Sequence, residues 1–187
     1  LEELSAACHE HGLKLFVDGA RLAYALTSPA NDVSMADLTR LSDVFYIGGT
    51  KCGTLFGEAV VIPDGGSIRQ FVTQMKQHGA LLAKGRLLGV QFEALFEDDL
   101  YLTLGAPGVA ATKRIREALI RAGYVVTMDS PTNLTFVALD QAGHERLSRK
   151  VQYGIWETLP DGRLLARFCT SWGTPEEDIK AFEAALA

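Results

Sequence analysis

The sequence predicts an α/β fold in which a mostly parallel sheet is followed by a small α+β domain. Two short apolar runs, Leu15–Val17 and Val44–Ile47, are bounded by glycine, as is typical of strands that are buried on both faces. Beyond residue 108, helical spacing alternates with short apolar runs to the end of the chain. The stretch Gly105-Ala-Pro-Gly108 interrupts the pattern, so we expect one domain over 1–104 and a second over 105–187.

The first domain is expected to begin with an amphipathic helix that stops at Gly12, because glycine often follows the last helical residue. One face of this helix combines Leu4, Ala7, Cys8 and His11, and we expect that face to be buried. A short helix is expected near Ala23–Leu26. Ser34 precedes a segment over 35–41 that it can cap as a further helix.

After the second strand we expect a third strand at Ala59–Ile62 and then two long helices. Ser67 predicts the start of the first helix, with Gln70 as the second member of a capping box. Gly79 separates it from the second helix, whose apolar stripe is Leu81, Leu88, Phe92, Leu95 and Phe96. The apolar surface of residues 67–96 exceeds what one chain can cover, so we expect a homo-oligomer, a dimer or a tetramer.

The second domain is predicted to alternate helices and strands. A helix over 109–122 ends at Gly123, strands are expected at 124–128, 134–139, 154–158 and 164–170, and a helix near 142–151 separates the middle pair. Thr174, Pro175 and Glu177 predict the start of the last helix, with Thr174 as its cap and Glu177 completing a capping box.

Composition and charge exclude several classes of function. The formal net charge of −5 over 187 residues argues against binding to nucleic acids or anionic membranes. No apolar run approaches the 18 or so residues of a membrane span, and the N-terminus lacks the character of a signal peptide. Three cysteines without a C-x-x-C pattern indicate reduced thiols in the cytoplasm rather than disulfides or zinc. Cys52 is expected to be a small packing residue beside Lys51.

Two polar residues follow the apolar strands and suggest a site. Asp18 comes directly after the first strand, and Lys51 follows the second through Gly48, Gly49 and Thr50. In an open parallel sheet, ligands bind beyond the carboxyl ends of the strands. Pyridoxal 5'-phosphate (PLP) needs both residue types, because its aldehyde bonds to a lysine and its ring nitrogen needs an acidic partner. The glycines around Lys51 would let the backbone pass close to a flat ring.

The runs Phe-Val-Asp-Gly-Ala-Arg-Leu and Gly-Gly-Thr-Lys-Cys-Gly together resemble the threonine aldolase and beta-eliminating lyase family, which has the large aspartate-aminotransferase-like fold (fold type I). The resemblance implies that Asp18 holds the pyridine nitrogen and that Lys51 bonds to the aldehyde of PLP. It implies that Arg21 faces the site and helps to hold the substrate carboxylate. The alternative for Arg21 is a helix-start residue bonded to Asp18.

The resemblance also implies that this chain is the C-terminal portion of such an enzyme, comprising the end of its large PLP-binding domain and its small domain. The ring-stacking histidine and most of the phosphate cradle of the family would then lie in the N-terminal half. A basic residue that family members direct toward the phosphate across a dimer is not matched: Leu82 stands about at its position, and Lys84 and Arg86 are the nearest bases.

Arg167 is the candidate for substrate binding in the second domain. It lies within Leu-Leu-Ala-Arg-Phe-Cys-Thr-Ser-Trp, a run that resembles the carboxylate-binding strand of the family. An arginine in an apolar strand is costly to bury without an anion, and its guanidinium binds carboxylates through two hydrogen bonds. The alternative is an edge-strand arginine paired with a surface acid.

The four histidines offer no metal pattern, so no metal site is expected. His9 and His11 belong to the opening helix, away from the strand ends. His78, near the predicted helix break, could approach the site of a neighbouring subunit, although a solvated or interface position is the simpler interpretation.

The resemblance to this family implies a lyase that cleaves the Cα–Cβ bond of a β-hydroxy-α-amino acid, converting threonine or allo-threonine to glycine and acetaldehyde. One alternative on the same scaffold is β-elimination, in which Lys51 removes the Cα proton. A second alternative, from a different class, is a catalytically silent fragment that serves only in assembly.

Overall fold

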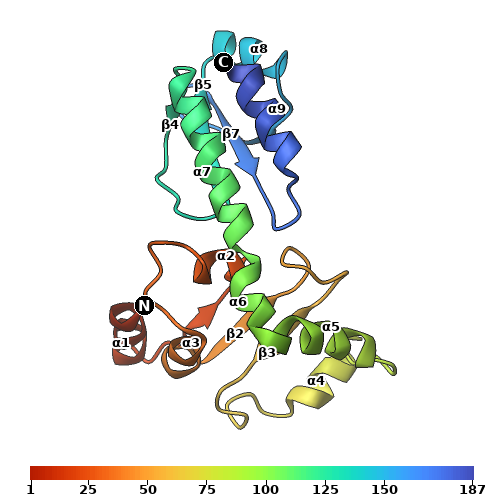
Figure 1. Ribbon diagram of the computed structural model, residues 1–187. Coiled ribbons are helices and arrows are strands. Elements are labelled where there is room, and N and C mark those ends of the chain that lie inside the picture. Colours follow the sequence, from red (N-terminus) through yellow and green to blue (C-terminus); the bar gives the residue numbers. More distant parts are fainter. The chain divides into compact units, whose positions relative to one another are not determined.

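The computed structural model describes all residues from 1 to 187, which divide into two compact units (Figure 1). The first unit consists of Leu1–Leu26 and Asn31–Thr103, and the second of Thr27–Ala30 and Leu104–Ala187. The expectation that the first of these is the end of a larger PLP-binding domain stays a prediction.

The sheet of the first unit is mixed. Its order is β1-β2-β3, with β1 at Phe16–Val17, β2 at Val44–Gly48 and β3 at Glu58–Val61. β1 and β2 run parallel, but β3 pairs antiparallel with β2. The expectation of a mostly parallel sheet is therefore met only for the first pair. A helical connection separates β1 from β2, whereas the loop 49–57 returns the chain directly alongside β2, which permits only antiparallel pairing.

The first unit also contains several helices. They are α1 (Glu2–Glu10), α2 (Leu22–Leu26), α3 (Met35–Leu41), α4 (Phe71–Gln77), α5 (Arg86–Phe96) and α6 (Leu100–Leu104), with a 3₁₀ turn η1 at Glu97–Asp99. Of these, α1, α2 and α3 lie about where local signals indicate, and α6 was not predicted. Ser34 caps α3 as predicted: its side chain accepts from the backbone N–H of Asp37, whose carboxylate accepts from the N–H of Ser34. Gly12, with φ +68°, follows α1.

The buried face of α1 differs from the expected one. Leu4 is 55% exposed, whereas Ser5 is buried. The reason is that polar contacts hold this helix: Glu2 pairs with Arg40 at 2.9 Å and His9 pairs with Asp43 at 3.1 Å. Positions 2, 5 and 9 share a helical face, so these contacts turn Ser5 inward.

The segment 67–85 is less helical than predicted. α4 begins at Phe71 rather than Ser67, and Gln70 has a left-handed φ of +53° with no capping hydrogen bond from its side chain. The predicted capping box is therefore wrong, because a left-handed residue cannot lie inside the first helical turn. Gly79, at φ +70°, separates the two helices as expected, but α5 begins only at Arg86 and leaves Leu81 outside it.

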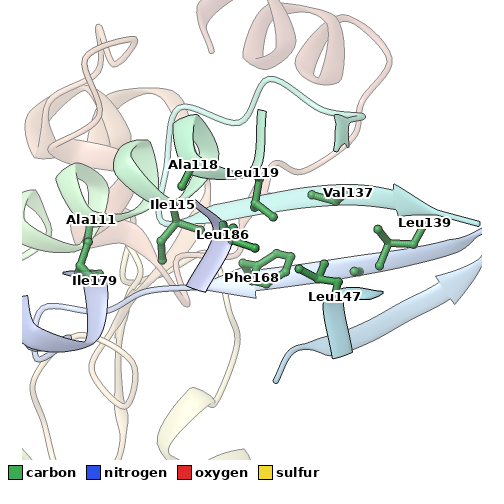
Figure 2. Packing of buried hydrophobic residues seen from close by; sticks show 11 residues of the cluster. Ala111, Ile115, Ala118, Leu119, Val137, Leu139, Leu147, Phe168, Ile179 and Leu186 are labelled. Atoms are coloured by element: carbon green, nitrogen blue, oxygen red, sulfur yellow. The ribbon is translucent and has the colours of Figure 1, made fainter. Parts of the chain in front are cut away.

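The second unit packs helices against a four-stranded antiparallel sheet. The strand order is β4-β5-β7-β6, with β4 at Val125–Val126, β5 at Leu134–Leu139, β6 at Gly154–Thr158 and β7 at Leu164–Cys169. The helices are α7 (Ala106–Arg121), α8 (Gln141–Ser148) and α9 (Glu176–Leu186). Figure 2 shows their apolar side chains meeting those of β5 and β7, including Leu119, Val137 and Phe168. This core fixes β7, the strand that contains Arg167.

The start of α9 corrects one prediction. Pro175 is the N-cap residue and no side chain caps the helix. Thr174 therefore lies one residue before the N-cap position, its hydroxyl accepts a hydrogen bond from the backbone N–H of Ser171 at 2.8 Å, and the predicted capping box does not form. None of the helices in the structure has the length and apolar character needed to span a bilayer.

Candidate active site

The parallel pairing of β1 and β2 brings their carboxyl ends to one edge of the sheet. Asp18 follows β1 directly, and Lys51 lies in the loop after β2. The backbone N–H of Gly48 donates to the carbonyl of Gly19 at 2.9 Å, which joins the two strand ends. The two residues therefore follow strand ends at the same edge of the sheet, and the convergence of their side chains on one ligand stays a prediction.

Asp18 is an exposed carboxylate whose anionic form is favoured. Its Oδ1 accepts the hydroxyl proton of Tyr46 and the backbone N–H of Ala20, the latter at 3.0 Å. These two hydrogen bonds, and after them the positive charges of Lys51 and Arg21, lower the pKa of Asp18 below its ordinary value. A hydrogen bond to the charged form and a nearby opposite charge both stabilise an ionised carboxylate.

The backbone around Lys51 is held by three side chains. Tyr24, fully buried, donates to the carbonyl of Lys51 at 2.7 Å. Tyr101, also fully buried, donates to the carbonyl of Gly48 at 2.9 Å, and the carboxylate of Glu58 accepts from the N–H of Gly49 at 2.7 Å. The main chain of the loop is thereby fixed, while the side chain of Lys51 remains exposed.

The glycines of this region make close contacts with the chain itself. A Cβ atom on Gly19 would lie 1.7 Å from the carbonyl oxygen of Tyr46, and one on Gly48 would lie 2.4 Å from that of Gly19. A Cβ on Gly49 would lie 2.4 Å from the carbonyl oxygen of Gly57. Only glycine permits this approach of backbone to backbone, so the strand ends and the lysine loop depend on it.

Arg21 lies between β1 and α2 and is half-buried. Its Nε atom is buried and has no hydrogen-bond partner. A buried guanidinium N–H without an acceptor is costly, and an anion placed against it would satisfy it. Together with the carboxylate of Asp18 and the exposed amine of Lys51, this unsatisfied donor fits a site for an anionic cofactor or substrate.

Arg167 lies in the second unit, on an interior strand. β7 is bordered by β5 and β6, and Arg167 is paired with Phe136 on one side and Gly154 on the other. Its guanidinium stacks over the ring of Trp156, 4.8 Å from the ring centre. The alternative of an edge strand is therefore wrong, and the ion pairs of the structure do not include this arginine. Stacking on an aromatic face leaves the N–H groups at the rim of the guanidinium free to bind a carboxylate.

Comparison with known proteins places the chain in a family. The family model described as beta-eliminating lyase matches residues 1–152. This chain belongs to the beta-eliminating lyase family. It is 29% identical to the low specificity L-threonine aldolase of Pseudomonas aeruginosa over 96% of this chain and 51% of that protein, and 29% identical to that of a Pseudomonas species over 100% and 53%. The chain thus spans about half the length of the curated relatives it matches.

One solved structure supports this assignment, and two more distant ones share the fold. A threonine aldolase of Leishmania major superposes with a TM-score of 0.91 at 43% identity, covering 99% of this chain and 54% of that one. A serine palmitoyltransferase of Sphingomonas wittichii shares the fold with a TM-score of 0.68 at 16% identity, over 99% and 50% of the two chains. A structure of SPT with PLP also has this fold, at a TM-score of 0.62 and 15% identity over 98% and 50%.

Within this member of the beta-eliminating lyase family, the structure adds residues that sequence reasoning missed. Tyr46, Tyr24, Tyr101 and Glu58 contact Asp18 or the lysine loop, and Trp156 contacts Arg167. Tyr46 could have been found from the parallel register, since Val17 lies opposite Phe45 and the next pair is therefore Asp18 and Tyr46. The other contacts join residues far apart in sequence and leave no local signal.

The other residues considered in the sequence analysis are either buried in the core or exposed on the surface. Cys52 is fully buried and its thiol pKa is raised by that burial, which suits the packing role expected for it and opposes a role as a nucleophile. His78 follows the last residue of α4 and is exposed. Lys84 and Arg86 are exposed near the start of α5.

Substitution of Gly49 by alanine tests the close packing of the lysine loop. The added Cβ would meet Gly57 and also the ring of Phe92 at 2.8 Å, so we expect the free energy of unfolding to fall by about 1–3 kcal/mol, as for overpacking generally. Urea denaturation measures this change. The matched control is Gly89→Ala, where a Cβ has nothing within 4 Å and alanine should be neutral or stabilising. Equal stability of the two variants would contradict the packing described here.

Proposed function

We propose that the protein is a PLP-dependent lyase that cleaves the Cα–Cβ bond of a β-hydroxy-α-amino acid, converting threonine or allo-threonine to glycine and acetaldehyde. The observation on which this depends is that Asp18 and Lys51 both follow the carboxyl ends of the parallel strands β1 and β2, which are joined by the hydrogen bond from Gly48 to Gly19. Membership of the beta-eliminating lyase family and similarity to proteins named threonine aldolase support the choice of reaction.

Asp18 and Lys51 would hold the two ends of the cofactor ring system. The carboxylate of Asp18 would keep the ring nitrogen protonated, and the amine of Lys51 would bond to the aldehyde. When bound, PLP supplies an electron sink for the pair of electrons left by the broken bond. The rigid backbone at Lys51 would fix the position of the amine's attachment, while its exposed side chain can release the aldehyde to the substrate amine.

Two arginines would hold the substrate. The unsatisfied Nε of Arg21 and the stacked guanidinium of Arg167 are suited to the α-carboxylate of an amino acid. By fixing that carboxylate, the two arginines would set which of the bonds to Cα is oriented for cleavage.

We also propose that the intact enzyme is a cytoplasmic homo-oligomer. An apolar hollow of about 800 Å³ lies between the lysine loop and α5, and its lining includes Leu55, Phe56, Leu87 and Val90. Leu55 is 88% exposed and Leu87 is 70% exposed, and large contiguous apolar surface of this kind usually marks an interface. The three cysteines are free thiols, in keeping with a reducing compartment.

Borohydride reduction in the presence of PLP tests the role of Lys51. We expect a pyridoxyl group to become fixed on the Lys51 side chain, because its amine is the one that bonds to the aldehyde, and peptide mass analysis locates it. Lys51→Ala should abolish the label, whereas Lys84→Ala should retain it. Modification of another lysine with Lys51 untouched would remove Lys51 from the proposal.

The products formed from threonine identify the reaction. Glycine and acetaldehyde support the proposal, whereas 2-oxobutanoate with ammonia indicates β-elimination instead.

Removal of the Arg167 side chain tests substrate binding. Arg167→Ala is expected to raise KM for the amino acid roughly tenfold to over a hundredfold, since a lost charged hydrogen-bond pair is worth about 1.5–3 kcal/mol. PLP absorbance and assembly should not change. Arg167→Lys should restore only part of the loss, because an ammonium cannot reproduce the planar fork that stacks on Trp156. Arg163→Ala, which removes an arginine paired with Asp161, is the matched control. Dissociation of the oligomer by Arg167→Ala, with KM intact, would make Arg167 a structural residue.

Sedimentation of the intact protein tests the oligomer. We expect an assembly larger than one chain, and we expect Leu87→Glu to dissociate it because a charge would be buried in the apolar interface. The control is Ile120→Glu, on an exposed position of α7 in the second unit, which should leave the assembly intact. A monomeric parent protein would end this part of the proposal.

A further inference from the structure

Both hydrogen-bond donors that reach Asp18 bind the same oxygen. The hydroxyl of Tyr46 and the N–H of Ala20 donate to Oδ1, and neither donates to Oδ2. We propose that Tyr46 is a positioning residue for Asp18: by holding Oδ1 it keeps the carboxylate in one orientation and presents Oδ2 to the ring nitrogen of the cofactor. This inference rests on the proposed function, in which Asp18 is the partner of that nitrogen.

The sheet register places the two side chains together. Phe16 lies opposite Val44 and Val17 opposite Phe45 in the parallel pair, so Asp18 and Tyr46 come next in register. Alternate residues of a strand point to the same face, which puts Phe16 and Asp18 on one face beside Tyr46. The rings of Phe16 and Tyr46 lie 6.0 Å apart. The position of the Tyr46 phenol is therefore set by the backbone of β2 and by the contact with the Phe16 ring.

The groups around Asp18 and Tyr46 determine the protonation state of the Tyr46 phenol. The hydrogen bond to Asp18, followed by burial and the negative charges of Asp18 and Glu58, raises the pKa of Tyr46 to about 12. The phenol thus keeps its proton at neutral pH and acts as a donor, not as a base. The same bond, with the Ala20 N–H and the charges of Lys51 and Arg21, keeps Asp18 ionised.

A carboxylate with both oxygens free can rotate about its Cβ–Cγ bond. Two donors on Oδ1 restrict that rotation, so less conformational entropy is lost when Oδ2 meets the ring nitrogen. Phenylalanine at position 46 would keep the ring and its contact with Phe16 while removing only the donor. It is therefore the informative substitution.

The test uses the intact protein, the variants Tyr46→Phe, Asp18→Asn and the double variant, and Tyr153→Phe as a matched control that loses a hydroxyl bonded to His144 in the second unit. The first readout is the pKa of Asp18 in cofactor-free protein, from the carboxyl ¹³C resonance that is missing in Asp18→Asn. We expect this pKa to rise in Tyr46→Phe and to stay unchanged in Tyr153→Phe. The second readout is the Kd for PLP, which Tyr46→Phe should weaken about two- to tenfold, the loss of one hydrogen bond, and only while Asp18 is present.

Each contrary result overturns a distinct step. An unchanged pKa of Asp18 in Tyr46→Phe means that the hydrogen bond is not held in solution, and it refutes the role of Tyr46 while leaving the proposed function standing. An equal weakening of PLP binding by Tyr46→Phe with and without Asp18 means that Tyr46 acts elsewhere, which also refutes it. If Asp18→Asn binds PLP as tightly as the parent, the proposed function loses its ring partner, and the inference fails with it even where the pKa of Asp18 moves.

Discussion

The contact between the backbones of Gly19 and Gly48 is the constraint on which the site depends. The N–H of Gly48 binds the carbonyl of Gly19, and a Cβ atom at either position would collide with the opposite main chain. Any larger residue would push the strand ends apart. Because Asp18 precedes one glycine and Lys51 follows the other by three residues, this single approach brings the backbone positions of the acidic and basic residues to the same edge of the sheet.

Around that contact, hydrogen bonds hold the backbone of the lysine loop, while the side chain of Lys51 is left exposed. Two buried tyrosines and Glu58 bind main-chain atoms at Gly48, Gly49 and Lys51, so the path of the loop is set by hydrogen bonds whose loss would leave buried polar groups unpaired. The side chain of Lys51 takes no part in this and stays exposed. A lysine that must bond to an aldehyde and release it needs a fixed origin and a free amine. The lysine loop supplies both, because the hydrogen bonds that hold it are made to main-chain atoms and not to the Lys51 amine.

Short-range sequence signals predicted many of the helices and strands, whereas the pairing of strands and of distant side chains was not predicted. The strands at Val44 and Leu134, the Ser34 cap and the stop at Gly123 follow from short-range rules and are confirmed. The antiparallel direction of β3 was missed because it depends on the pairing of β3 with β2, and the short loop 49–57 between them leaves no room for the crossover of a parallel pair. Tyr46 was missed for a related reason: its partner Asp18 is 28 residues away, and only the register of β1 against β2 brings them together.

Arg21 gives this sheet edge a specific donor for an anionic ligand. The two cations there, Lys51 and Arg21, lie near Asp18, whose pKa they lower, and Glu58 adds a second carboxylate beside the lysine loop. The preference for an anion therefore depends on an unpaired donor and not on the net charge of the edge. That donor is the buried Nε of Arg21, because a buried donor without an acceptor stabilises whatever anion reaches it. A phosphate-bearing cofactor and an amino-acid carboxylate both meet this requirement, whereas a neutral ligand would leave that donor unsatisfied.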